Sequence, residues 1–151
     1  MGECEVFITV ISGVLVFILG QLFNEYFLKP IQDYKKLRAK IAYTLTLYAN
    51  LFMNPVTLEA ATQEYSDASL EIRKLSASVD AMIELKPLGN VFIPKRSAMK
   101  DSAKALMGIS NRFIVNDTFD SSKQNDIDRK IIYKSLKIKS YMKVRKAKKH
   151  N

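Results

Sequence analysis

The feature that most constrains this chain is an uninterrupted apolar run near its N-terminus. From Val6 to Phe23 the sequence reads VFITVISGVLVFILGQLF, 18 residues without a charged side chain. At about 1.5 Å per helical residue, such a run reaches about 27 Å, which is close to the hydrocarbon thickness of a bilayer. A buried helix of a soluble domain is typically shorter and amphipathic. The run therefore predicts a transmembrane helix.

The residues on either side of the run predict its orientation. Glu3 and Glu5 precede it, without any Lys or Arg. The basic residues that follow it are Lys29, Lys35, Lys36, Arg38 and Lys40. Since positive charge stays inside, we expect the N-terminus outside and the C-terminal part in the cytoplasm. A cleaved secretory signal is not expected, because the N-terminal residues are acidic and no small-residue cleavage site follows. Val6 also stands where a myristoylation motif needs Ser or Thr.

Small and polar residues gather on one face of the expected span. At about 100° per residue, these positions fall within roughly 120° of one another. They are Thr9, Ser12, Gly13, Gly20 and Asn24. Small residues let helix backbones approach closely in lipid, so this face is a candidate for self-association. The alternative is that these residue types are simply common in membrane spans.

Positive charge concentrates at the other end of the chain. The sequence has 24 Lys and Arg against 15 Asp and Glu, and ten of the 24 lie from Arg129 onward, where no acidic residue occurs. Such a tail can contact anionic lipid headgroups, hold nucleic acid, or only solvate a terminus. Because the chain is already anchored, we expect lipid first and nucleic acid second. The residues assigned to this contact are Lys134, Lys137, Lys139, Lys143, Arg145, Lys146, Lys148 and Lys149.

Apolar periodicity behind the anchor predicts helices. One is expected over residues 31–52, with Pro30 either opening it or kinking a single long helix. Asn54 as N-cap and Pro55 in the first turn predict a second helix that runs to about Leu85. Its apolar positions step by three and four residues, which gives a heptad seam typical of coiled-coil packing. The seam is Leu58, Ala61, Tyr65, Ala68, Ile72, Leu75, Val79 and Met82. We favour packing of the seam within the chain over packing on another chain.

Two further helices are expected after Pro87 and Gly89 break the chain. One covers residues 97–114, with an apolar stripe of Met99, Ala103, Leu106, Ser110 and Phe113. Residues 116–125 read as a polar loop, and the last helix begins near Asp126. Its stripe is Ile127, Ile131, Ile138, Tyr141 and Met142. The predicted fold is all-α: a transmembrane helix, then an antiparallel bundle of three to four helices, then a basic C-terminal helix. The corresponding ranges are 1–28, 29–128 and 129–151.

No catalytic constellation is recognisable in the sequence. Cys4 and His150 are the single cysteine and histidine, so a Cys/His zinc site or nucleophile lacks its residues. No phosphate-binding glycine motif occurs. The aspartates at 117, 120, 126 and 128 do not have the spacing of a calcium loop. We therefore expect a non-enzymatic protein without cofactor, metal or small-molecule substrate.

Three stretches carry a resemblance. They are Phe27–Tyr34 (FLKPIQDY), residues 41–50 with Ile41–Leu45 (IAYTL) and Tyr48–Asn50 (YAN), and Ala105–Asn111 (ALMGISN). These stretches resemble uncharacterised bacterial single-pass membrane proteins with a cytoplasmic helical domain. The resemblance implies a bacterial inner-membrane location and transfers no activity or site residue.

These observations lead to three readings of function. The first is a membrane-anchored interaction or scaffold protein, which binds a protein partner or another copy of itself. The second is a small bacterial membrane effector, of the defence or toxin type, whose oligomers perturb the bilayer. The third is a membrane tether for nucleic acid through the basic tail.

Overall fold

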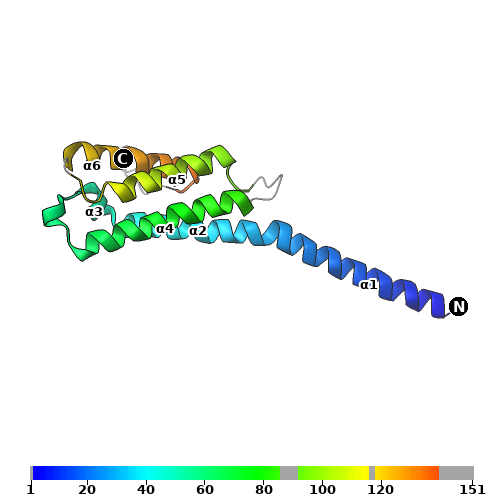
Figure 1. The fold of residues 1–151 in the computed structure, drawn as a ribbon. Helices are drawn as coiled ribbons and strands as arrows, with labels where there is room; N and C mark the ends of the chain where they lie inside the picture. Colours follow the sequence, from blue (N-terminus) through cyan, green and yellow to red (C-terminus); the bar gives the residue numbers. More distant parts are fainter. Residues whose placement is uncertain (1, 86–91, 116–117, 140–151) are drawn as a thin grey trace, which may run out of the picture.

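The computed structural model describes residues 2–85, 92–115 and 118–139. Within these ranges the chain is helical and has no β-strand, and Val56 and Ile114 form an isolated bridge. Helix α1 (Glu3–Phe23), the π-helical segment η1 (Asn24–Leu28) and helix α2 (Lys29–Leu47) follow one another without a break. Figure 1 shows this rod leaving the rest of the protein at one end, with α1 extending away and α2 packed among the other helices.

The π-helical segment explains how the rod accommodates a proline. Pro30 lies in the first turn of α2, where it lacks an amide hydrogen and where its ring crowds the carbonyl four residues earlier. In the preceding segment the backbone widens, and the amide of Lys29 donates to the carbonyl of Asn24, five residues back. Of the two alternatives for Pro30, the structure therefore has the single long helix, locally widened rather than ended.

The remaining helices form what we call the bundle, together with α2. They are α3 (Ala49–Met53), the 3-10 turn η2 (Leu58–Ala60), α4 (Gln63–Leu85), α5 (Arg96–Asn111) and α6 (Thr118–Ser135). The long helices α2, α4, α5 and α6 lie side by side and alternate in direction (Figure 1). α4 and α5 share the most extensive contact, α6 packs on α5, and α2 packs on α4.

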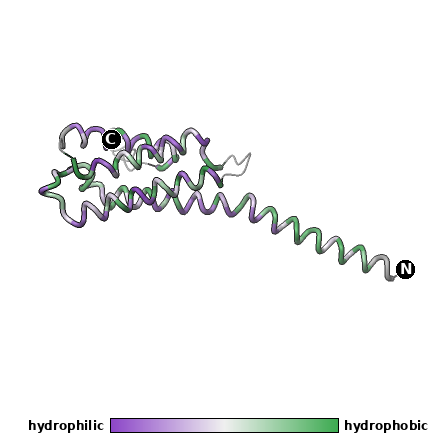
Figure 2. The backbone as a smooth tube through the Cα atoms, in the orientation of Figure 1, coloured by the Kyte–Doolittle hydropathy of each residue, from purple (hydrophilic) through white to green (hydrophobic). Residues whose placement is uncertain are grey.

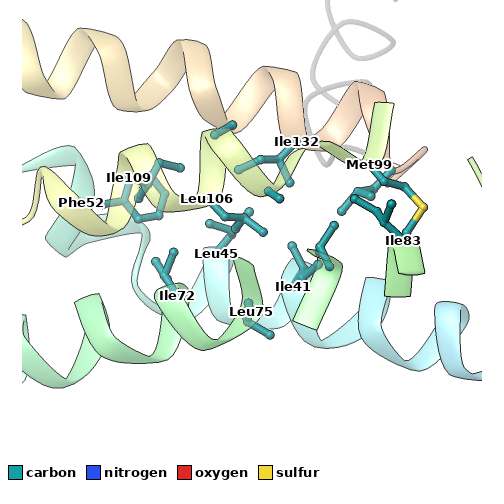
Figure 3. Close-up of a cluster of buried hydrophobic side chains, with 14 of the residues drawn as sticks. Ile41, Leu45, Phe52, Ile72, Leu75, Ile83, Met99, Leu106, Ile109 and Ile132 are labelled. Atoms are coloured by element: carbon teal, nitrogen blue, oxygen red, sulfur yellow. The ribbon is translucent and has the colours of Figure 1, made fainter. Parts of the chain in front are cut away.

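The core of the bundle is apolar and draws side chains from all four long helices. Figure 3 shows several of them converging: Ile41 and Leu45 from α2, Ile72 and Leu75 from α4, Leu106 and Ile109 from α5, and Ile132 from α6. Burying one such side chain contributes about 1.5–3 kcal/mol before the entropy of ordering is subtracted. Tyr34 closes the core near the start of α2 and donates its hydroxyl hydrogen to the carbonyl of Leu136, with a separation of 2.6 Å.

Small side chains bring α4 and α5 close together. Ser76 Oγ donates to the carbonyl of Ala103 at 2.8 Å, and Ser69 Oγ donates to the carbonyl of Ser110 at 2.8 Å. A buried serine hydroxyl that donates to a carbonyl of the neighbouring helix has its hydrogen-bond partner, and its small side chain lets the two backbones approach closely. Each expected stripe residue of 97–114 is buried, from Met99 to Phe113.

The expected helix start at Asn54 and Pro55 is wrong. Asn54 instead closes α3, with its side-chain Nδ2 donating to the carbonyl of Asn50 at 2.8 Å. The chain then runs extended past Pro55, where Val56 exchanges backbone hydrogen bonds with Phe113 and Val115. α4 begins at Gln63, so this detour through long-range pairing delays the helix.

The expected polar loop at 116–125 is also wrong for the residues that the structure describes. α6 begins at Thr118 rather than near Asp126. Its polar side chains bind the end of α3: Ser122 Oγ donates to the carbonyl of Met53, and the buried Asn125 Nδ2 donates to the carbonyl of Phe52, both at 2.6 Å. The last carbonyls of a helix lack partners within the helix, and here residues far along the sequence supply them.

α6 ends at Ser135, before most of the basic C-terminal residues. Lys137 has φ of 54°, and the amide of Ile138 donates to the carbonyl of Tyr133 at 2.9 Å. This is a Schellman end, which normally places glycine at the left-handed position. α6 crosses the expected boundary between residues 128 and 129, because Ile132 and Leu136 belong to the core. The predicted basic C-terminal helix therefore does not continue beyond Ser135 within the described residues up to 139.

Candidate functional site

α1 turns its side chains to the surroundings and not to the bundle. Every side chain from Val6 to Phe23 is exposed, although nearly all are apolar. In Figure 2 hydrophobic residues predominate along α1, whereas hydrophobic and hydrophilic residues alternate along the helices of the bundle. The helix Val6–Leu47 contains a stretch long and apolar enough to cross a membrane. No part of the described chain covers this surface.

The residues assigned to self-association lie on α1 and at the start of η1, away from the bundle. They are Thr9, Ser12, Gly13, Gly20 and Asn24. A side chain added at Gly13 or Gly20 would meet nothing within 4 Å. The face is therefore open to close approach by a second helix.

The end of the apolar run carries the pairings typical of a membrane interface. Phe23 and Phe27 stack with their ring centroids 5.3 Å apart. One turn further, Lys29 Nζ lies 3.0 Å from Glu25 Oε2. The hydrogen bond and the charge of Glu25 raise the pKa of Lys29 above its ordinary value. Aromatic and paired charged side chains favour the headgroup region over the hydrocarbon.

The predicted seam divides between two environments. Leu58 lies in η2 and is 76% exposed, and Ala61 lies before α4, so neither belongs to the helix. The other positions lie on α4, where Ala68, Ile72, Leu75 and Val79 are buried and Tyr65 and Met82 are half-buried. They contact α2 and α5 of the same chain. Ile83 and Ser76 are buried beside them and were not included in the seam.

A groove of about 1080 Å³ runs between α5 and α6. Small and apolar residues form its floor, among them Ala98, Ala105 and Gly108 on α5 and Ile131 on α6. Basic side chains stand along its rim: Lys95 and Lys104 from the α5 side, and Lys134 and Lys137 from the α6 side. Asp101 is the acidic residue among them in the open part of the groove. The groove is thus apolar in its depth and positive at its edges.

A polar network closes one end of the groove. Arg112 Nη2 pairs with Asp128 Oδ2, and Arg112 Nε donates to Asn125 Oδ1 at 2.8 Å. Both ionic side chains are largely covered, with 24% and 11% of their surfaces exposed. Gln124 Nε2 donates to the other oxygen of Asp128 at 3.3 Å. The network joins the end of α5 to the middle of α6 and, through Asn125, to α3.

Gly108 is the residue that makes room for this network. A Cβ at this position would lie 2.8 Å from Asp128 Oδ2 and 3.0 Å from Arg112 Nη2. A larger residue would therefore push the ion pair apart. Glycine costs helix stability relative to alanine, so its place within α5 has a packing reason.

The basic residues assigned to lipid or nucleic acid are only partly described. Lys134 and Lys137 line the groove, and Lys139 is exposed just beyond them. The other assigned residues lie outside the described part of the chain: Lys143, Arg145, Lys146, Lys148 and Lys149.

Neither the groove nor the ion pair was predicted from the sequence, where Asp128 was considered only as one of four aspartates without the spacing of a calcium loop. The one local signal was Gly108, a glycine inside a regular helical pattern, which often marks close packing. Within the described ranges, no group of three or more His, Cys, Asp or Glu side chains is placed to hold a metal ion. No family model, curated protein or solved structure matches the chain.

Proposed function

We propose that this chain is a membrane-anchored, non-enzymatic interaction protein that presents its bundle at the cytoplasmic face of a bacterial inner membrane. The observation that carries the proposal is the division of the rod formed by α1, η1 and α2. Its first part is predominantly apolar and is not covered by any other segment that the structure describes, and its second part belongs to the core of the bundle. An anchor continuous with the bundle holds the bundle near the bilayer and restricts its orientation. The acidic N-terminal flank and the basic residues after Phe23 support a cytoplasmic bundle.

The groove between α5 and α6 is the surface we assign to a protein partner. Its apolar floor suits the apolar face of a helix, and its lysine rim suits acidic residues on either side of that face. We therefore assign an acidic amphipathic helix of another protein as the occupant. Charge complementarity of this kind raises the rate of association and selects among partners.

A labelled model helix tests the groove directly. The intact protein in nanodiscs of neutral lipid is titrated with a fluorescent amphipathic peptide of Leu, Ala and Glu. We expect saturable binding that weakens about tenfold or more when Lys104→Glu and Lys134→Glu are combined, since two rim charges reverse. Lys74→Glu with Lys123→Glu changes the net charge equally but leaves the groove rim intact, and binding should persist. Equal loss in both double variants would show that only net charge matters and would refute the groove.

A second candidate, the membrane effector, is favoured by the open small-residue face of α1. Gly13 and Gly20 leave space for a neighbouring helix, so copies of α1 can assemble in lipid. Under this proposal, induction of the intact protein depolarises cells, and the variant Gly13→Leu with Gly20→Leu does not. An unchanged membrane potential with the intact protein would contradict the effector and leave the interaction protein as the proposed function.

A further inference from the structure

Two large apolar side chains are exposed at one end of the bundle. Leu85 ends α4 and is 78% exposed, and Phe92, a few residues before α5, is 74% exposed. Figure 1 shows that α4 ends and α5 begins at the end of the bundle from which α1 departs. We call this the anchor end, and the end with α3 and η2 the far end. Large apolar side chains that are exposed at the same place indicate a surface that contacts another protein or a membrane.

Basic side chains gather at the same end of the bundle. Lys95 and Arg96 lie at the start of α5, and Lys137 and Lys139 follow α6. Leu136, directly after α6, accepts the hydrogen bond of Tyr34 near the start of α2. Acidic side chains are fewer here: Glu84 is exposed on the last turn of α4, and Asp33 lies 3.8 Å from Lys36. The anchor end therefore combines exposed apolar groups with an excess of positive charge.

The start of α5 is unfavourable for its own helix. Helix N-termini favour acidic residues, yet α5 has Lys95 as its N-cap residue, Arg96 directly after it, and no acidic residue in its first turn. Local helix chemistry does not account for this choice. An anionic surface in front of the helix does, because it would pair with both the basic side chains and the exposed amide groups.

The anchor limits what can lie in front of this end. α1, η1 and α2 form one continuous helix. A bilayer that contains α1 therefore has its headgroup region near η1. The anchor end of the bundle is the end turned toward this headgroup region, because α1 leaves the bundle there (Figure 1). Basic groups attract an anionic leaflet within about one Debye length, roughly 10 Å at 0.1 M salt.

We propose that the anchor end of the bundle is a second contact with the bilayer. Leu85 and Phe92 enter the interfacial region, and Lys95, Arg96, Lys137 and Lys139 contact anionic headgroups. The bundle then stands on the membrane with its far end directed into the cytoplasm. This inference rests on the membrane anchoring in the proposed function, and two of its basic residues, Lys95 and Lys137, also stand on the rim of the groove.

Nitroxide labels on the intact protein test the contact. In a Cys4→Ser background, a single cysteine is placed at Phe92, at Leu58 on the far end, or at Val16 within α1. Leu58 is the matched control, because it is 76% exposed and Phe92 is 74% exposed. The protein is reconstituted in phosphatidylcholine vesicles with or without phosphatidylglycerol. Collision of each label with oxygen and with a water-soluble nickel complex then reports its depth.

We expect the label at 92 to show a several-fold higher ratio of oxygen to nickel collisions than the label at 58 in vesicles with phosphatidylglycerol. Lys95→Glu with Arg96→Glu should return the label at 92 toward water, and Lys74→Glu with Lys123→Glu should not.

Labels at 92 and 58 that are equally aqueous, or equally lipid-exposed, would overturn the proposal, provided that the label at 16 reports lipid. An aqueous label at 16 would instead refute the anchor. Withdrawal of the label at 92 from lipid by short duplex DNA would favour nucleic acid at this surface and overturn the lipid assignment.

Discussion

Single side chains in this protein act mainly by being buried or by joining helices. Ile72 is fully buried on α4, whereas Leu70, two residues earlier on the same helix, is 50% exposed. The Arg112–Asp128 pair connects α5 to α6 in a partly covered setting. The two cases differ physically. A core aliphatic side chain stabilises the fold because its apolar surface is removed from water. In a covered ion pair, each charge offsets the cost of removing the other from water.

Truncation of Ile72 should be costly. Ile72→Ala removes fully buried methyl groups and leaves a cavity, so we expect the free energy of unfolding to fall by about 2–5 kcal/mol. Leu70→Ala on the exposed side of α4 should change it by less than about 0.5 kcal/mol. Thermal unfolding of the intact protein in detergent, followed by circular dichroism, measures both. Equal melting temperatures for the two variants would show that the buried face of α4 is assigned wrongly.

Loss of one partner of the ion pair should cost more than loss of both. Asp128→Ala leaves the covered Arg112 guanidinium without its carboxylate, and we expect a loss of about 1.5–3 kcal/mol. Arg112→Met combined with Asp128→Leu removes both charges, so its loss should be smaller than the sum of the single losses. Asp80→Ala, at an exposed position on α4, is the control. Strict additivity of the two single changes would contradict coupling between these residues.

Helices in this chain are shaped at their ends by contacts or by unusual backbone. The π-helical segment Asn24–Leu28 absorbs Pro30, and α3 ends on hydrogen bonds from α6. Two residues after the end of α6, Lys137 has φ of 54°, a conformation in which the side chain of an L-residue crowds the backbone. Glycine has no such penalty at that position.

Replacement of this lysine should therefore stabilise the protein. Lys137→Gly relieves the left-handed strain, and we expect a gain of about 1 kcal/mol, which corresponds to a few degrees in Tm. Lys134→Gly lies in the last turn of α6, where glycine should cost up to about 1 kcal/mol instead. Opposite shifts in Tm for these two neighbouring lysines form the test. A destabilised Lys137→Gly would show that the Lys137 side chain contributes more than its backbone costs.

The molecule as a whole is asymmetric along the rod. α1 offers an apolar surface, the anchor end is basic, and the far end begins α4 with Glu64 and Asp67 and α6 with Asp120. This order of apolar, basic and then more acidic surface matches the order of hydrocarbon, headgroups and cytoplasm.

The proposed topology makes a direct prediction for fusions of the intact chain. With the bundle inside, a fluorescent protein fused after Asn151 should be bright, and alkaline phosphatase at the same place should be inactive. Changing Lys29, Lys35 and Lys36 to Glu together should weaken this bias by removing part of the positive flank. High phosphatase activity from the unmodified chain would reverse the orientation and with it the cytoplasmic bundle.

Features set by local composition and short-range periodicity were predictable. The apolar run of α1 needs no partner to be recognised, and the stripe from Met99 to Phe113 is buried as expected, because its spacing matches one helical face. Ala68, Ile72, Leu75 and Val79 of the predicted seam are buried for the same reason. The all-helical fold class follows from these patterns.

Only tertiary contacts decided the rest. Ile132 in α6 and Leu136 directly after it are buried, whereas the expected stripe residues Ile127 and Ile131 are 42% and 37% exposed. Neighbouring helix positions differ by about 100°, so the position of α5 and α3 around α6 selects which isoleucine enters the core. The start of α6 depends in the same way on Asn125, whose hydrogen bond to Phe52 spans 73 residues of sequence. A bond formed over that separation leaves no local pattern, which is why Thr118 to Asn125 read as a loop and fold as a helix.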